Sequence, residues 1–340
     1  MGFNLTTVQF DTFISALTAS FRVFAPTSVR GKGKFSDTNV IGYGEVQSFT
    51  EMVIDQKSYY SPKEIFYPIR ETLFYFNGNE IIEPKLDEKP ILIFLRPCDL
   101  NGIKRLDTIF LKNGDVVDYY YLRRRNLIRF AMIECTTGFD SCFCVSMGTN
   151  VASEYDLAVR FGAEQMMLEV KDNAFTAFLP SDVKTLDFKP EFINKNQVEV
   201  TVPHPDAIQE SIFNHPIWTE YTQRCISCGR CNTSCITCSC FTMQDTKLSD
   251  DQKIGERRRV WAGCHVDGFT DMAGGHTFRA KKGDRMRFKA MHKINDFHKR
   301  FGFHMCVGCG RCDDVCPEYI SFSKCINKIN QIITEGQNNE

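Results

Sequence analysis

The sequence predicts two domains: a mixed α/β (α+β) domain over residues 1–203 and a mainly helical domain over residues 204–340. Three observations support this division. Short apolar and β-branched runs, separated by Gly, Asn, Asp and Pro, fill the first part and indicate strands. Two prolines, Pro203 and Pro205, mark a linker or domain edge. Beyond that edge the strand signals are few, and most of the 16 cysteines occur there.

The first domain is expected to begin with a helix over residues 5–19, whose apolar residues repeat at i, i+3, i+4 and i+7. These are Phe10, Phe13, Ile14 and Leu17. A second helix is predicted at about Asp99–Leu111, with Asp99 as its capping residue. Five apolar runs predict strands, namely Leu73–Phe76, Ile91–Leu95, Ile128–Ile133, Met166–Val170 and Val198–Val202.

The second domain contains two helical patterns. One has apolar residues at Met286, Ala290, Ile294 and Phe297. The other is expected to form the terminal helix and is marked by Ile320, Ile326, Ile329 and Ile333. Cys325 falls within this terminal pattern, so we predict that it is a core residue.

Composition limits the function classes. The formal net charge of −1 does not give the basic footprint of a nucleic-acid-binding protein. The longest apolar runs are too short for a transmembrane segment, and Met1–Leu5 lacks the pattern of a signal peptide. We therefore expect a cytoplasmic protein, whose clustered thiols in a reducing compartment are metal ligands rather than disulfides.

Two cysteine motifs carry the chemistry. Each has the spacing C-x2-C-x2-C-x3-C, which is that of bacterial ferredoxins, and Pro317 follows the second motif. They predict two 4Fe–4S clusters, so the second domain should be a ferredoxin-like dicluster domain. The motif cysteines are Cys225, Cys228, Cys231 and Cys235 in the first, and Cys306, Cys309, Cys312 and Cys316 in the second.

In two-cluster ferredoxins the fourth cysteine of each motif usually binds the other cluster. A crossed assignment gives Cys316 to the cluster of the first motif, and Cys235 to the cluster of the second. The motifs are 70 residues apart (306 − 235 − 1), so the crossing stays open at this point. The alternative to iron–sulfur binding is a pair of zinc ribbons, but a repeated triple C-x2-C-x2-C exceeds the needs of a tetrahedral ion.

The first domain has four cysteines of its own, and we predict a third 4Fe–4S cluster there. Cys98 follows the run Ile91–Leu95, and Cys135 follows Ile128–Ile133 with Cys142 and Cys144 close behind. If both runs are neighbouring strands, their carboxyl ends bring these thiols to one edge of the sheet. The alternative is that several of these cysteines are small buried apolar residues.

A last group comprises Cys238, Cys240 and Cys264, for which shelter beside the first motif is the simpler interpretation. His265 or His276 is a candidate for a fourth ligand of that group. Between Arg279 and Arg300 there are nine Lys and Arg against two Asp and Glu. That run is either a solvated helix face or a source of positive charge for anionic clusters or an acidic partner.

No nucleotide-binding glycine motif is complete, so neither a nucleotide nor a flavin is expected on this chain. No histidine pairs with a nucleophile or a carboxylate, so no catalytic residues are assigned. These absences indicate an electron relay that does not catalyse a reaction by itself.

With these residues in view, the chain resembles the iron–sulfur electron-transfer subunits of the anaerobic sulfite reductase family nearly from end to end. The resemblance rests on the segments Arg22–Pro26, Thr72–Phe76, Cys142–Asn150, Arg224–Cys231, Asp271–His276 and Met305–Asp314. One departure is Ile236, where the family tends to have proline. The resemblance implies partners: a flavin subunit that takes electrons from NADH and a sirohaem subunit that reduces sulfite to sulfide. The alternative is a β subunit of the related cytoplasmic sulfhydrogenases, and a third reading is a zinc-stabilised scaffold.

Overall fold

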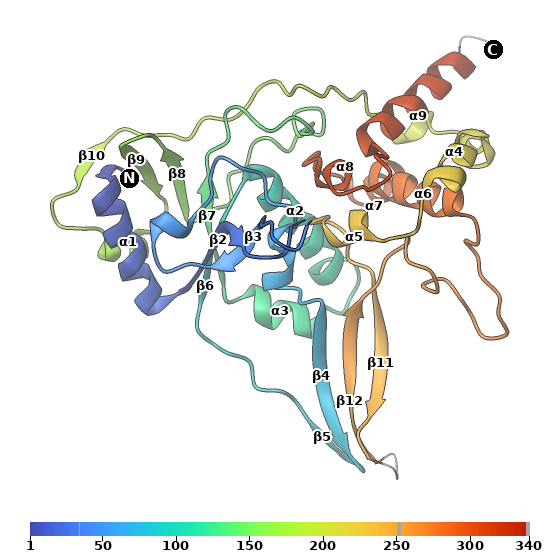
Figure 1. Cartoon of the computed structure of the whole chain (residues 1–340), viewed down its shortest axis with the longest axis horizontal. Coiled ribbons are helices and arrows are strands. Elements are labelled where there is room, and N and C mark those ends of the chain that lie inside the picture. Colours follow the sequence, from blue (N-terminus) through green and yellow to red (C-terminus); the bar gives the residue numbers. More distant parts are fainter. Residues whose placement is uncertain (34, 250–252, 338–340) are drawn as a thin grey trace.

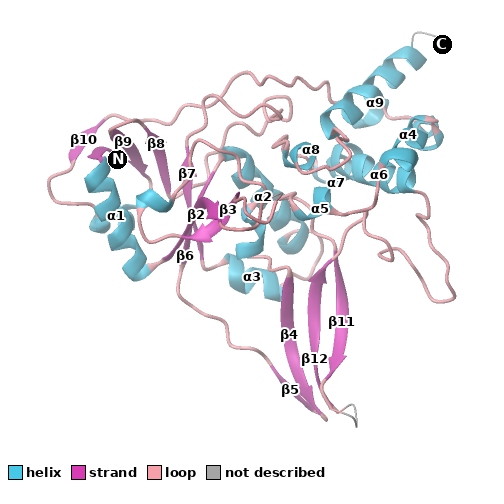
Figure 2. Cartoon of the chain, viewed as in Figure 1, coloured by secondary structure: helices cyan, strands magenta, loops and turns pink. Residues whose placement is uncertain are grey.

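The computed structural model of the chain describes residues 1–33, 35–249 and 253–337 (Figure 1). An eight-stranded mixed sheet occupies one side of the molecule, and short helices surround the cysteine loops on the other side (Figure 2). The strand order is β10-β1-β9-β8-β7-β6-β2-β3. The strands span β1 Gly2–Thr6, β2 Arg22–Val29, β3 Val40–Glu45, β6 Ile91–Leu95, β7 Ile128–Ile133, β8 Leu157–Phe161, β9 Gln165–Val170 and β10 Lys184–Leu186.

The centre of this sheet is parallel, because β2, β6, β7 and β8 run in the same direction. Helix α1 (Thr7–Ser20) covers one face and buries the four predicted apolar residues. Helix α2 (Pro97–Leu111) and helix α3 (Tyr119–Arg125) pack on the opposite face. Strands β6 and β7 are buried on both faces, as expected for parallel strands under helices. The mixed α/β character predicted for the first part is therefore confirmed.

A second sheet forms an arm that extends from the body (Figures 1 and 2). Its order is β11-β12-β4-β5, and every pairing is antiparallel. The strands are β4 Arg70–Asn77, β5 Glu80–Ile82, β11 Phe241–Lys247 and β12 Ile254–Trp261. The arm thus joins strands from both sides of the expected boundary after residue 203, which itself stays a prediction.

The arm corrects the expectation of little strand structure after residue 204, since β11 and β12 form a hairpin there. A buried arginine fixes the arm to the body. Arg259 of β12 is 1% exposed and donates to Glu71 at 2.8 Å and to Asp118 at 2.7 Å. These two carboxylates allow the charged side chain of Arg259 to be buried.

The predicted strand Val198–Val202 is wrong. The backbone of this segment bonds to side chains instead of to another strand: the N–H of Val200 donates to Ser146 Oγ at 3.0 Å. The N–H of Thr201 donates to Asn327 Oδ1 at 2.9 Å. The prolines that follow also restrict an extension of the sheet.

The C-terminal helices pack around a core that contains Trp218, Tyr221, Ile294 and Phe322. Cys325 is fully buried in this core, which confirms its predicted role. The elements are α4 Ile217–Arg224, α5 Arg230–Thr233, α6 Lys282–Met291, a π-helix His292–Asp296, α7 Phe297–Phe301, α8 Arg311–Asp314 and α9 Phe322–Gln337. Short 3-10 turns are Phe49–Glu51, Pro62–Ile65, Asn173–Phe178, Pro205–Ala207 and Glu210–Asn214. Within the described residues, none of the helices has the length and apolar character needed to span a bilayer.

Candidate iron–sulfur centres

The two cysteine motifs fold into loops of the same shape. The second residue after the first cysteine is left-handed in both, with φ of 60° at Ser227 and 62° at Gly308. The fourth residue is left-handed as well, with φ of 72° at Gly229 and 71° at Gly310. The turn directs a backbone N–H at sulfur, because Ser227 N donates to Cys225 Sγ and Gly308 N donates to Cys306 Sγ, both at 3.4 Å. Such amide–sulfur bonds stabilise an anionic cluster.

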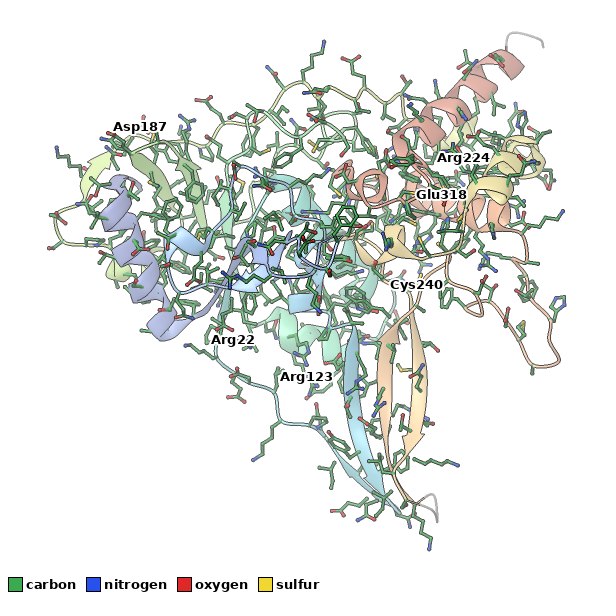
Figure 3. All side chains as sticks on the ribbon, in the orientation of Figure 1. Arg22, Arg123, Asp187, Arg224, Cys240 and Glu318 are labelled. Carbon is green, nitrogen blue, oxygen red and sulfur yellow. The ribbon has the colours of Figure 1, made fainter. Side chains whose placement is uncertain are left out.

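Centre A is the cavity beside the first loop, and it contains thiols from both motifs. Its lining includes Cys225, Cys228, Cys231 and Cys316. The N–H of Ile320 donates to Cys316 Sγ at 3.3 Å. The guanidinium of Arg224 donates to the carbonyl oxygen of Glu318 at 2.7 Å and holds the two motifs together; these two residues lie side by side in Figure 3. The fourth cysteine of the second motif therefore lies with the first three of the first motif.

Centre B is the complementary group of Cys235 with Cys306, Cys309 and Cys312. Burial raises the pKa of Cys306 to about 12, and the nearby Cys235 and Cys309 thiols add to this effect. Cys235 is also among the neighbours that raise the pKa of Cys309 and of Cys312, after burial as the main cause. Cys235 is thus close to all three cysteines of the second loop, as the crossed assignment requires.

Centre C is the group of Cys98, Cys135, Cys142 and Cys144. Strands β6 and β7 are parallel neighbours, so the thiols that follow them reach the same edge of the sheet. Burial raises the pKa of Cys144 to about 12, with contributions from the neighbouring Cys142 and Cys135. Burial likewise raises the pKa of Cys98, and Cys144 is one of the groups that contribute. The structure therefore brings the four cysteines together.

One polar group of centre C lacks a partner. Asn196 Oδ1 accepts from Val145 N at 2.8 Å and from Cys144 Sγ at 3.6 Å. The Nδ2 atom of Asn196 is buried and has no hydrogen-bond partner among the described residues. A buried amide without a partner costs about 1–3 kcal/mol. The inorganic sulfides of a bound cluster are acceptors that such an amide fits.

Centres B and C are in direct contact through backbone. The N–H of Phe143 donates to the carbonyl oxygen of Gly308 at 2.7 Å. The thiol of Cys142 lies 3.8 Å from the carbonyl oxygen of Cys309. The contact requires glycine, because a Cβ on Gly308 would lie 2.5 Å from the carbonyl oxygen of Phe143. Centre B therefore lies between centre A, whose cavity Cys312 also lines, and centre C.

A buried ion pair joins the second loop to helix α2. Arg311 binds Asp99 through two hydrogen bonds of 2.5 and 2.9 Å, and their side chains are 4% and 0% exposed. The prediction that Asp99 caps α2 is thus wrong, since Arg96 occupies the N-cap position. Asp99 instead accepts from Arg311 and from the Tyr43 hydroxyl at 3.3 Å. No local sequence signal marks this pairing, because its two members are 212 positions apart in the sequence.

Two lysines of the basic segment 279–300 are buried beside the cysteines instead of lying on a solvated face. Lys289 and Lys293 are each 3% exposed. Burial alone would lower the pKa of Lys289, but the surrounding sulfurs, with Cys231 and Cys312 first, raise it well above its ordinary value. Cys235 and Cys238 act in the same way on the pKa of Lys293. Both lysines are placed to balance negative charge at centres A and B.

The donors at these centres fit 4Fe–4S clusters in chemistry and grouping. All 16 cysteines are free thiols. Across residues 1–33, 35–249 and 253–337, no three His, Cys, Asp or Glu side chains converge on the position of a single metal ion. The thiols of centre A are spread around a cavity, with backbone N–H groups directed at sulfur.

Comparison with known proteins agrees with this chemistry. Residues 224–320 match the family model described as a 4Fe-4S dicluster domain, so this part of the chain is such a domain. The chain is also similar to the sulfhydrogenase 2 subunit beta of Pyrococcus furiosus. The two are 29% identical over 342 residues, which cover 96% of this chain and 98% of that protein. No solved structure matches the chain significantly.

Proposed function

We propose that this chain is the iron–sulfur electron-transfer subunit of a multi-subunit oxidoreductase of the sulfhydrogenase type. The observation that carries the proposal is the crossed grouping of thiols in centres A and B within the dicluster domain. The similarity to a sulfhydrogenase β subunit over nearly the whole chain supports the type of complex.

In this proposal centre A binds one 4Fe–4S cluster, centre B binds the second and centre C binds a third. Bound clusters of this type supply one-electron transfer. The protein contributes the thiolates, the N–H groups directed at sulfur and the buried lysines that balance charge. The position of centre B between the other two favours a relay in which electrons pass along the line A, B, C in either direction. The two ends of this line differ in exposure: Cys228 of centre A is exposed, whereas Cys142 and Cys144 of centre C are buried.

The cluster assignment is tested by iron and acid-labile sulfide analysis of anaerobically prepared protein. Cys98→Ser combined with Cys144→Ser should lower the iron content by about 4 Fe per chain. Cys325→Ser is the matched control, because Cys325 is a buried thiol outside every centre. The Cys325→Ser protein should therefore keep the full iron content. An iron content equal to that of the control would remove the cluster of centre C.

The second candidate is the iron–sulfur subunit of an anaerobic sulfite reductase, between a flavin subunit that uses NADH and a sirohaem subunit. The segments around both cysteine motifs favour it, but the relative found by comparison favours the sulfhydrogenase reading.

Partners isolated with the chain distinguish the two candidates. A complex that reduces the clusters with hydrogen supports the sulfhydrogenase type, and one that reduces sulfite with NADH supports the other. In both cases the isolated chain should accept electrons from a strong reductant and should neither bind flavin nor oxidise NADH. Flavin binding with NADH oxidation by the isolated chain would contradict the relay role.

A further inference from the structure

We propose that Cys238, Cys240 and Cys264 bind a further iron–sulfur cluster through three thiolates, at the base of the β arm. We call this group centre D. It lies outside the family-model pattern of two clusters and outside the three centres above. The proposal does not depend on which partner subunits the chain has.

The β hairpin brings the three thiols together. Cys240 immediately precedes β11 and Cys264 lies three residues after β12, and these strands are paired from Phe241 with Trp261 onward. The N–H of Ala262 extends this ladder by donating to the carbonyl oxygen of Cys240 at 3.0 Å. The two ends of the hairpin therefore meet at the junction with the body, where Cys240 lies in Figure 3.

A buried amide connects two of the sulfurs. The Nδ2 atom of Asn232 donates to Cys264 Sγ at 3.4 Å and to Cys238 Sγ at 3.6 Å. Its Oδ1 atom accepts from the N–H of His265 at 3.2 Å, so the orientation of the amide is fixed. Asn232 is 4% exposed. One donor directed at two thiols is the arrangement that stabilises negatively charged sulfur.

Gly263 permits this close approach. A Cβ at Gly263 would lie 2.9–3.0 Å from atoms of the Asn232 side chain. A side chain there would push the Cys264 segment away from the amide. The site is therefore built from groups on three segments: the first cysteine loop, the residues before β11 and the residues after β12.

The strongest argument for bound negative charge is a buried lysine. Lys63 is 1% exposed, and its Nζ donates to the carbonyl oxygen of Cys238 at 2.7 Å. The same Nζ lies 3.8 Å from the centre of the Trp261 ring. In the described part of the chain no carboxylate forms an ion pair with Lys63. A buried ammonium without an anionic partner costs several kcal/mol.

The hydrogen bond from Lys63 to the backbone of Cys238 places its buried ammonium group beside the thiols of this region. A second buried lysine, Lys293, lies near these residues, where its Nζ donates to Thr237 Oγ1 at 2.8 Å. Neutral thiols would not offset the burial of these two ammonium groups, but the anionic charge of a bound cluster would.

Three thiolates suit a 3Fe–4S cluster, or a 4Fe–4S cluster whose fourth iron has a ligand other than cysteine. The imidazole of His265 lies beside the site, with Nδ1 3.3 Å from Cys264 Sγ. Cys235 of centre B is next to Cys238, since the N–H of Cys238 donates to the carbonyl oxygen of Cys235 at 3.4 Å. A cluster at centre D would extend the relay from centre B toward the β arm.

The test uses the full chain prepared anaerobically, with Cys238→Ser combined with Cys264→Ser. This variant should lose about 3 Fe per chain if the cluster is 3Fe–4S, and about 4 if it is 4Fe–4S. One EPR signal should disappear while those of the other centres remain. Cys325→Ser again serves as the buried-thiol control. Iron content and EPR spectra identical to those of the control would overturn the proposal.

A second pair of variants tests the cluster at centre D if the double serine variant misfolds and loses all its clusters. Lys63→Met keeps the length and apolar packing beside Trp261 but removes the charge, whereas Lys63→Arg keeps the charge. Lys63→Met should keep the full iron content and shift the reduction potential of one cluster to more negative values. Potentials that match those of Lys63→Arg for every signal would overturn the proposal. These readouts do not involve the partner subunits, so they succeed or fail independently of the proposed complex.

Discussion

Replacing Asp99 by asparagine should lower the free energy of unfolding more than any surface substitution does. The reason is that it leaves the buried charge of Arg311 without its partner. Arg311 is held from two directions. Asp99 accepts the two bonds of 2.5 and 2.9 Å, and Ser58 accepts two more, at 3.1 Å through its carbonyl oxygen and at 2.9 Å through Oγ. Of these acceptors, only Asp99 carries a charge. Asp99→Asn keeps the shape of the site and removes that charge.

The expected cost follows from burial. Breaking a buried ion pair by removing one partner costs about 3–5 kcal/mol. The exposed pair of Arg22 with Glu45 at 2.8 Å is the control, with side chains 35% and 37% exposed. Glu45→Gln should cost about 1 kcal/mol or less. Arg311 also lies between two cysteines of centre B, so Asp99→Asn should speed the loss of iron.

The assay is urea unfolding of anaerobic, cluster-loaded protein, with released iron measured on the same samples. Asp99→Asn should lower the urea midpoint strongly, and Glu45→Gln should leave it near the native value. The double variant Asp99→Leu with Arg311→Met has no unpaired charge, so it should be more stable than Asp99→Asn. A midpoint for Asp99→Asn within error of that for Glu45→Gln would refute this account of the ion pair.

Three further predictions follow from the loops and the helices. Gly308→Ala should lower the cluster content, because its Cβ would lie 2.5 Å from the Phe143 carbonyl oxygen. The control is Gly78→Ala, at a similar positive φ in open space, which should affect only stability, by about 1 kcal/mol. Chelation of iron should make the loops at 224–237 and 262–320 sensitive to protease before the eight-stranded sheet becomes sensitive. The reason is that metal binding supplies much of the folding free energy of such loops. Equal rates of cleavage in the loops and in the sheet would argue against this. Burial lowers the pKa of His292 to about 4 from 6.5, so the unfolded state binds more protons between these values and stability should fall as the pH drops from 6.5 to 4. His292→Gln should flatten that part of the profile of stability against pH, and an unchanged slope would show that other groups cause it.

The local chemistry of this protein could be read from its amino-acid sequence. The spacing of the two cysteine motifs specifies what one loop can present to a cluster, and that information lies within about ten residues. The apolar periodicities of α1, α6 and α9 also describe faces that each helix must bury whatever its neighbours are. Strands β6 and β7 were predictable for a similar reason, because strands buried on both faces read as nearly continuous apolar runs.

The contacts between distant segments, in contrast, became known only from the folded structure. The return of Cys316 to the first loop and of Cys235 to the second depends on packing across 70 intervening residues, and that separation left the crossed assignment open in the sequence. The same is true of β4 in the arm and of Asp99 with Arg311. Charged residues were the hardest to place from the sequence. Their side chains are of a type expected at the surface, but four of them are buried, namely Lys63, Lys289, Lys293 and Arg259. Their burial is favourable only beside opposite charge, and that charge is brought to them by the fold and by the thiolates that it assembles.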